Sequence, residues 1–430
     1  MKGAPAIIND PEAAPALRLE ALERHAAEIR GELPAFGGEI NNHIHTIYSF
    51  SPYTPSMAAL RAREAGLEAA GSVDHDSYAA AEEMRRACAI LRIGCVTGFE
   101  LRVSFRHTEF RDRKINSPDS PGIAYMTVQG IPATAAPAVK NFLAPLNAAR
   151  ERRNRRMVEG LNGILAAAGL APLSYDGDIL PLSRHREGGS VTERHILYAL
   201  SLSLLKQVSP GPELPKYLRD TFGLEVPGRI AALLGDPDNP FCAYDLLGAL
   251  KSGFGDRIFI QPDETECLPA EKVNAFARSV NAIPSYAYLG DVGDSPTGDK
   301  RAEKFEDEYL DALMPRLVEM GFQGVTYMPP RNTGAQLERL HRLCVAAELI
   351  EISGVDINSP RQQFNCPEIR RPEFALLIDT TWALAAHETL CAEDPRRGLF
   401  HPENPLAEKS LRERIGIYAG IGRKGISEKP

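Results

Sequence analysis

Short apolar runs alternate with amphipathic stretches over residues 38–136 and again over residues 281–365. Runs such as EINNHIH, AAGSVDH and CVTGFELRV have the length of strands, and apolar residues at helical spacing follow the first two. Near the other end, NAIPSYAYLG, FQGVTYMP and LIEISGVDIN repeat the pattern. Because strands connected by helices usually pair in parallel, the pattern predicts an α/β fold with a mainly parallel sheet, open or closed into a barrel.

Residues with marked positional preferences predict where the helices begin and end. Thr54 stands as an N-cap before a proline, and Gly66 should close that helix. We expect Ser77 to cap the next helix and Gly94 to end it. Thr333 is expected to cap a later helix.

The regular alternation is interrupted between its two halves by long, mainly helical stretches. Two examples are the charged AARERRNRRMVEGLNGILAAAGL and the more apolar VTERHILYALSLSLLK. We therefore divide the chain into an N-terminal helical extension (1–37), a first part of the barrel (38–136), a mainly helical insertion (137–280), a second part of the barrel (281–365) and a C-terminal helical tail (366–430).

Charge and composition narrow the classes of partner. The 49 basic and 57 acidic residues give a net charge of −8, which argues against an extended nucleic-acid surface. No apolar run is long enough to cross a membrane and no secretory segment is recognisable, so we expect a cytoplasmic protein without a membrane partner. The seven cysteines form no CxxC pair, which predicts reduced thiols. A homo-oligomer remains possible.

Polar residues of metal-binding types stand at the ends of the expected strands. His43 and His45 lie two positions apart, so on a strand their side chains point to the same side. His75, Glu100 and Asp356 occupy the ends of three other strands. Imidazole and carboxylate together suit zinc, manganese or iron, and a bridging carboxylate such as Glu100 can hold two cations.

At these residues the chain resembles the PHP family, named for polymerase and histidinol phosphatase. NHIHTIYS, SVDHDS, GFELRV and SGVDIN correspond to its HxHT start, its DH motif, its glycine-x-glutamate strand and its final glycine-x-aspartate strand. The middle is similar to the branch that acts on nucleotide phosphates and short oligonucleotides, through a helix with Arg150 and Arg153 and a helix that His195 opens.

The resemblance implies a distorted (βα)7 barrel of the TIM-like type, the PHP fold, with one to three divalent ions (manganese, zinc or iron) and hydrolysis of phosphate esters. The residues carried over as metal ligands are His43, His45, Glu100 and Asp356 at a first site, His75 at another and His195 at the edge of a third.

The chain also departs from the family pattern. Phe50 or Ser51 replaces an early ligand, Tyr125 or Met126 and then Tyr288 stand where histidines are expected, and the last DxH motif ends in Asn358. These departures favour one well-made site, with a weaker second site built from His75, Glu100 and His195.

Other polar residues are candidates for catalysis and substrate binding. We expect Asp74 and Asp76 to orient an imidazole or relay a proton, and His107 to serve as a substitute ligand or general acid. Cationic loops at the same end of the barrel suit a phosphate group. Their candidate substrate-binding residues are Arg106, Arg111, Arg184, His185 and Arg331.

The sequence thus predicts a metal-dependent hydrolase of a small phosphorylated substrate: a nucleotide, a short oligonucleotide or a sugar phosphate. Two alternatives stay open. Activated hydroxide also cleaves other esters or amides. A barrel that has lost ligands could instead bind a metal or nucleotide without turnover.

Overall fold

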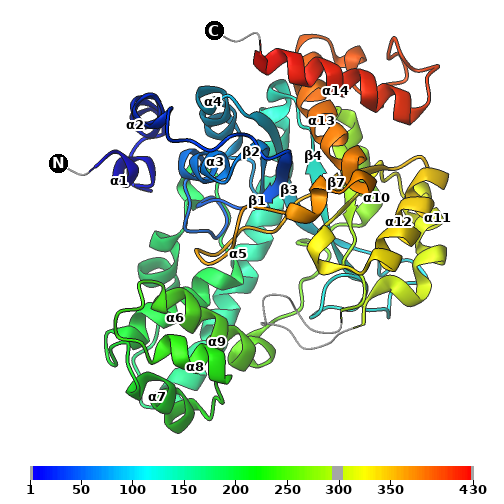
Figure 1. Ribbon diagram of the computed structural model, residues 1–430. Coiled ribbons are helices and arrows are strands. Elements are labelled where there is room, and N and C mark those ends of the chain that lie inside the picture. Colours follow the sequence, from blue (N-terminus) through cyan, green and yellow to red (C-terminus); the bar gives the residue numbers. More distant parts are fainter. Residues whose placement is uncertain (1–2, 293–303, 428–430) are drawn as a thin grey trace.

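The computed structural model describes residues 3–292 and 304–427. Within these residues, seven strands form one sheet whose spatial order is the order of the sequence (Figure 1). The strands are β1 (Glu39–Ile44), β2 (Leu67–His75), β3 (Gly94–Ser104), β4 (Ile123–Gln129), β5 (Ile283–Ala287), β6 (Gly324–Tyr327) and β7 (Ile350–Ser353).

The sheet curls until its first strand meets the segment after its last. β4 runs antiparallel to both of its neighbours, while the other pairings are parallel. Ile44 and Ile357 form a parallel bridge in which His45 N donates to Ile357 O at 2.9 Å and Ile357 N donates to His43 O at 3.0 Å. The expected α/β barrel is therefore confirmed as a nearly closed sheet of seven strands.

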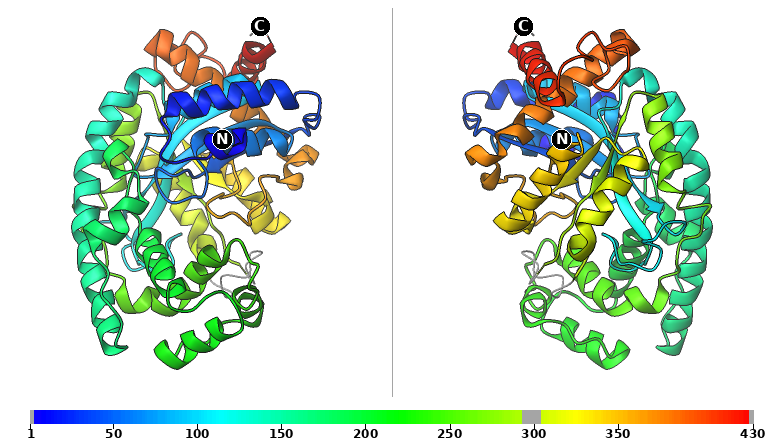
Figure 2. Two further views of the ribbon diagram at one scale, coloured as in Figure 1. Left: turned by 90° about the vertical axis from the view of Figure 1, so that its left-hand side faces the viewer. Right: turned by 90° about the vertical axis from the view of Figure 1, so that its right-hand side faces the viewer.

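Helices surround this sheet and extend beyond both of its ends (Figures 1 and 2). In the described residues they are α1 (Ala4–Ile8), α2 (Pro15–Ile29), α3 (Pro55–Glu64), α4 (Ala81–Leu91), α5 (Ala136–Ala167), α6 (Glu193–Leu205), α7 (Glu213–Phe222), α8 (Gly228–Leu234), α9 (Cys242–Ile258), α10 (Ala270–Ser279), α11 (Leu310–Glu319), α12 (Gly334–Ala346), α13 (Ala375–Glu393) and α14 (Leu411–Ser427). Helices α6–α9 lie together at one end of the molecule, and α13 and α14 lie at the other (Figure 2).

The alternation of side chains along β3 shows how the barrel separates its core from its site. Phe99, Leu101 and Val103 are buried in a large apolar cluster with residues of α5, α10, α11 and α12. Because side chains alternate across a strand, Glu100 and Arg102 share the opposite, inward face. The strand thus packs with one face and carries charged groups on the other.

The insertion has an apolar core of its own. Residues from the second half of α5 and from α6–α9 form a cluster separate from that of the barrel. Phe50, from the loop after β1, joins this cluster. Helix α10 packs instead with the barrel strands.

Three of the predicted helix ends are confirmed and two are wrong. Gly66, at φ 79°, directly follows the C-cap residue of α3 and closes that helix as expected. Thr54 accepts a hydrogen bond from Met57 N, and Thr333 forms a capping box with Gln336. Ser77 caps no helix, because α4 begins later, at Ala81. Gly94 already belongs to β3, and Arg92, at φ 56°, ends α4 in the left-handed conformation that Gly94 was expected to supply.

No helix within the described residues is both long and apolar enough to span a membrane. All seven cysteines lie in the described part of the chain, and none of them forms a disulfide.

Candidate metal centre

The end of the first strand, which carries His43 and leads to His45, is held in place by the segment before Asp356. Asn41 Oδ1 accepts hydrogen bonds from His43 N at 2.9 Å and from Val355 N at 3.0 Å, and Asn41 Nδ2 donates to Val355 O at 3.0 Å. A Cβ atom at Gly354 would lie 2.5 Å from His43 N, so only glycine permits this approach. These contacts fix the start of the chain against a segment some three hundred residues later.

Ligand atoms from the end of β1, from β3 and from the segment after β7 converge at this end of the barrel. One ligand atom each from His43, His45 and Glu100 lies within 4.8 Å of the other two. Glu100 Oε2 is 3.7 Å from His43 Nε2 and 3.7 Å from His45 Nε2. Asp356 Oδ1 lies 3.4 Å from His45 Nε2. Four of the predicted ligands are thus brought together, while their binding of a metal stays a prediction.

The donor set fits a divalent cation. Nitrogen and oxygen ligands about 2.0–2.2 Å from a tetrahedral ion lie about 3.3–3.6 Å from one another, close to the separations found here. His45 is 1% exposed, yet its Nε2 has no hydrogen-bond partner among the described residues. A buried nitrogen without a partner is costly unless a ligand satisfies it, and here it points toward two carboxylates.

Burial and neighbouring charges shift the pKa values of two of the histidines that face Glu100, in opposite directions. Burial alone would lower the pKa of His43, but the carboxylates of Glu100 and Asp356 raise it above its ordinary value. Burial, with the positive charges of His45 and Arg150, holds the pKa of His75 well below its ordinary value.

His75 lies beside Glu100 because the two residues pair in the register of β2 and β3. Its Nδ1 is 3.0 Å from Glu100 Oε2, and its ring centroid is 4.6 Å from that of His45. Ser190 Oγ, from the insertion, donates to His75 O at 2.5 Å. His75 therefore borders the cluster and shares one carboxylate oxygen with it.

Asp74 supports the loop that follows His45 through hydrogen bonds to the first residues of that loop. Its carboxylate accepts hydrogen bonds from Thr46 N at 2.6 Å, from Thr46 Oγ1 at 2.6 Å and from Ser49 Oγ at 2.7 Å. Ser49 Oγ lies 3.4 Å from His45 Nδ1. Burial raises the pKa of Asp74, and these hydrogen bonds oppose the rise. The expected orienting role is thus supported through Ser49, and it remains a prediction.

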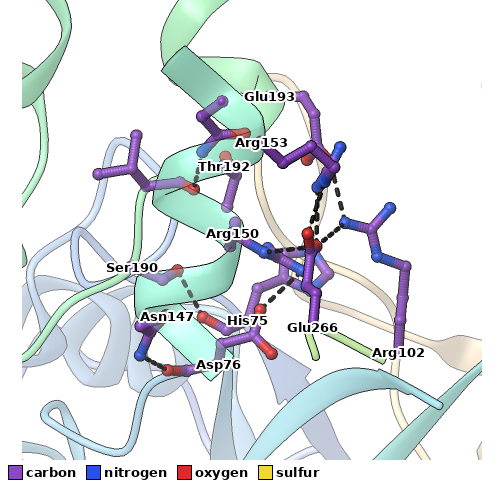
Figure 3. A network of polar contacts seen from close by, with 12 residues as sticks. His75, Asp76, Arg102, Asn147, Arg150, Arg153, Ser190, Thr192, Glu193 and Glu266 are labelled. Carbon is purple, nitrogen blue, oxygen red and sulfur yellow. Dashed lines mark hydrogen bonds and ion pairs between the residues drawn. The ribbon is translucent and has the colours of Figure 1, made fainter. Parts of the chain in front are cut away.

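Asp76 connects the barrel to the insertion. It has φ 48°, and its backbone N donates to Glu100 O at 2.8 Å. Its carboxylate is 2.7 Å from an Arg150 nitrogen, while its carbonyl accepts from Asn147 Nδ2 at 2.9 Å (Figure 3). Asp76 therefore holds α5 against the strand end that carries His75.

Arg150 belongs to a buried network that also contains Arg102 and Arg153 (Figure 3). Glu266 lies 2.8 Å from Arg102, 3.3 Å from Arg150 and 2.6 Å from Arg153, and Glu193 contacts Arg102 and Arg153 at 3.0 and 2.6 Å. Burial alone would raise the pKa of Glu193, but Arg102 and Arg153 hold it well below its ordinary range. The three guanidinium groups thus face carboxylates of this chain.

His195 is turned toward its own helix. Its Nδ1 accepts a hydrogen bond from Thr192 N at 3.0 Å, and its ring packs edge-on against Phe50 with centroids 5.0 Å apart. Burial lowers the pKa of His195 to about 3. The local contacts are those of a helix-capping residue, and a metal-binding role stays a prediction.

The residues that replace expected ligands have other partners. Phe50 joins the insertion core, and Tyr288 donates its hydroxyl hydrogen to Asp307 at 2.6 Å. The ring of Tyr125 lies 6.0 Å from that of His75. Asn358 contacts Asp356 through its amide nitrogen, at 2.7 and 2.8 Å from the two carboxylate oxygens.

The predicted substrate-binding cations lie in several different places. Arg106 donates to Pro262 O at 3.2 Å, and Arg111 is exposed beside Asp112. Arg184 pairs with Glu12 of the N-terminal extension.

His185 lies 3.3 Å from Ser183 Oγ. Arg331 ends the short helix η6 (Pro329–Arg331), which follows β6 at the carboxyl end of that parallel strand. His107, the candidate general acid, is 41% exposed and lies 2.9 Å from Glu271. Of these residues, Arg331 has the position in the fold that suits a substrate contact best.

Several residues that build the centre were missed by sequence reasoning. Asn41 stands two positions before His43, and Thr46 and Ser49 lie within the quoted segment NHIHTIYS, one and four positions after His45. Their proximity to the motif was an available signal. No comparable signal marked Glu266, which follows a long helical stretch and reaches the arginines only through the fold.

Comparisons with known proteins show no family assignment. No protein-family model matches the chain, and no curated protein matches it. One similar solved structure is a protein from Bifidobacterium adolescentis whose proposed activity is that of a metal-dependent phosphoesterase, with 20% identity over 77% of this chain and 92% of that chain at a TM-score of 0.48. Another is an amidohydrolase from Chromobacterium violaceum, with bound sulfate and no metal, at 18% identity over 79% and 95% of the two chains and a TM-score of 0.49.

Proposed function

We propose that this chain is a metal-dependent hydrolase of phosphate esters and a member of the PHP family, acting on a nucleotide, a short oligonucleotide or a sugar phosphate. The observation that carries the proposal is the convergence of His43, His45 and Glu100 within 4.8 Å around the buried Nε2 of His45, which has no hydrogen-bond partner in the described part of the chain. Asp356 completes a set of two imidazoles and two carboxylates. That combination suits zinc, manganese or iron.

Different side chains would bind the metal and the phosphate group of the substrate. His43, His45, Glu100 and Asp356 would hold one ion, and His75 with Glu100 offers part of a second, weaker position. The chemistry that a divalent ion supplies in such a site is polarisation of a phosphoryl oxygen and a bound water whose pKa falls toward about 7. Arg331 is the candidate contact for the remaining phosphate charge.

A metal-binding barrel without turnover is the second candidate, and one observation favours it. Asn358, Tyr288 and His195 engage Asp356, Asp307 and Thr192, so each makes a local hydrogen bond at a position expected to supply a ligand. The two candidates agree on metal binding and differ on phosphate release.

The test combines metal analysis with an activity panel. Purified protein is assayed for bound zinc, manganese and iron, and for phosphate release from a mononucleotide, a short oligonucleotide and a sugar phosphate with added Mn²⁺. We expect a bound ion and turnover of at least one substrate, both lost in His45→Ala and both kept in His25→Ala, a change on α2 outside the centre.

Bound metal without phosphate release would favour the second candidate. Release of a carboxylic acid from a panel of carboxylic esters and amides would instead indicate a metal-dependent hydrolase of those substrates. Protein without metal, and His45→Ala indistinguishable from wild type, would exclude both candidates.

A further inference from the structure

The carboxylate of Asp356 is held by the amide of Asn358, the residue that ends the last DxH motif in place of the expected histidine. Asn358 Nδ2 lies 2.7 Å from Asp356 Oδ1 and 2.8 Å from Asp356 Oδ2. Because the amide nitrogen is a donor, both carboxylate oxygens are held by one group. Asp356 Oδ1 is also the atom that lies 3.4 Å from His45 Nε2.

The orientation of this amide is fixed by a second residue, which comes from the insertion. Arg194, in the first turn of α6, donates through one terminal nitrogen to Asn358 Oδ1 at 2.8 Å. A guanidinium group is only a donor, so the oxygen of Asn358 must face Arg194 and its NH₂ must face Asp356. The backbone N of Asn358 donates to Gln362 Oε1 at 2.7 Å, which holds the residue from the other side.

Arg194 is itself positioned by aromatic packing. Its guanidinium carbon lies 5.2 Å from the ring centroid of Phe50, and the Phe50 ring lies edge-on to that of His195. Phe50 follows the histidine strand of the barrel, whereas Arg194 and His195 open a helix of the insertion. The insertion is thus connected to the ligand set by a continuous series of contacts.

We propose that Arg194 and Asn358 form a positioning pair that sets the orientation of Asp356 toward the metal, so that the insertion controls metal affinity. This inference rests on the proposed function. Removal of a group that hydrogen-bonds to a metal ligand typically changes metal affinity about 10- to 100-fold. Asn358 is expected to have an effect of this size, and Arg194 a smaller one, because it acts through Asn358.

The test measures metal affinity, with no substrate present. Mn²⁺ and Zn²⁺ are titrated in competition with a metal-binding dye into wild-type protein, Asn358→Ala, Arg194→Met and Arg194→Lys. We expect Asn358→Ala to lose about 10- to 100-fold in affinity and Arg194→Met to lose less. Arg194→Lys keeps a donor for the amide oxygen and should stay closer to wild type than Arg194→Met. Thermal unfolding of each metal-free variant separates these effects from a general loss of folding.

Two results would overturn the inference, and they are distinguishable. Metal binding by wild type that stays within about twofold in Asn358→Ala would remove the positioning role and leave the proposed function intact. Absence of binding by wild type would remove the proposed function and this inference with it. A metal-free variant that fails to fold is replaced by Asn358→Ser, which shortens the side chain with less change in polarity.

Discussion

At the scale of single residues, the polar groups at this end of the barrel are distinguished by what they contact. Within residues 3–292 and 304–427, the buried Nε2 of His45 has no hydrogen-bond partner, whereas the equally buried carboxylate of Asp74 accepts hydrogen bonds from Thr46 and Ser49. The first arrangement is that of a group prepared for a ligand, and the second is that of a structural support. The role of a buried polar side chain, ligand binding or structural support, can therefore be inferred from whether its hydrogen bonds are already made, because each unmet hydrogen bond is costly.

His387 provides a prediction at this scale, remote from the metal centre. Its Nε2 donates to Asn281 O at 2.7 Å and its Nδ1 accepts from Leu399 N at 2.9 Å, so the neutral ring is fully bonded. Burial lowers the pKa of His387 from 6.5 to about 4. Between about pH 6.5 and 4, the imidazole is protonated in the unfolded chain but stays neutral in the folded chain. The free energy of unfolding therefore decreases as the pH falls through this range.

His387→Gln keeps a donor and an acceptor but does not titrate. The free energy of unfolding of wild type should fall relative to this variant by up to about 3 kcal/mol between neutral pH and pH 4, measured by urea denaturation at several pH values. The comparison with the variant is needed because burial raises the pKa of neighbouring Glu388 to about 7. This shift makes the free energy of unfolding increase as the pH falls over much of the same range, which opposes the effect of His387. Parallel pH profiles for the two proteins would contradict the prediction.

At the scale of elements, two barrel strands are connected to helices α5 and α6 by buried ion pairs. The end of β2 contacts α5 through Asp76 and Arg150, and Arg102 on β3 contacts Glu193 at the start of α6. Buried ion pairs contribute little net stability when they form, because desolvation offsets their attraction, but they are costly to break. These ion pairs therefore fix the position of the insertion relative to the barrel, because a shifted arrangement would leave buried charges without partners.

Arg150→Met tests this junction. Removal of the guanidinium leaves the buried carboxylates of Asp76 and Glu266 with one cation fewer, so we expect the free energy of unfolding to fall by about 3 to 5 kcal/mol. Arg155→Met, on the same helix but in an exposed pair with Asp176, is the matched control and should stay close to wild type. Equal stability of the two variants in denaturant titrations would mean that the network is dispensable.

At the scale of the whole molecule, the candidate centre exists only when the sheet is closed. Its ligands come from β1, β2, β3 and the segment after β7, and the bridge from Ile44 to Ile357 brings the last of these to the first. Helices α13 and α14 form a further apolar cluster with residues at the amino ends of the strands, on the opposite side from the centre. An ion bound by this set would contact the folded state alone.

Metal should therefore stabilise the entire domain. An ion that binds only the folded chain adds about 2.7 kcal/mol to the free energy of unfolding when its free concentration is 100 times Kd. We expect Zn²⁺ or Mn²⁺ to raise the melting temperature in scanning calorimetry and a chelator to reverse the rise. Glu100→Gln should abolish the response, and Glu408→Gln, on the exposed surface, should retain it. A response that survives in Glu100→Gln would place the ion elsewhere.

Much of the barrel and the approximate location of the centre could be predicted from the sequence, because they depend on local patterns. Alternating apolar runs identify strands such as β3, and parallel strands bring their carboxyl ends together, so His43 and Glu100 could be expected to meet. The partners of Asn358 and Glu266 could not be predicted in this way, because they depend on how the insertion is placed against the barrel. Arg92 in a left-handed conformation also escaped prediction, since glycine is the usual residue there.

The pairing of the first strand with the segment after the last one has a consequence for how the protein is made. During synthesis His43, His45 and Glu100 leave the ribosome long before Asp356 does, and Gly354 and Val355, which hold β1 in place, arrive with it. The nascent chain therefore carries an incomplete set of donors until residues 354–356 have been synthesised. A cation that needs all four side chains could be bound in its final geometry only after the segment that carries Asp356 has been made.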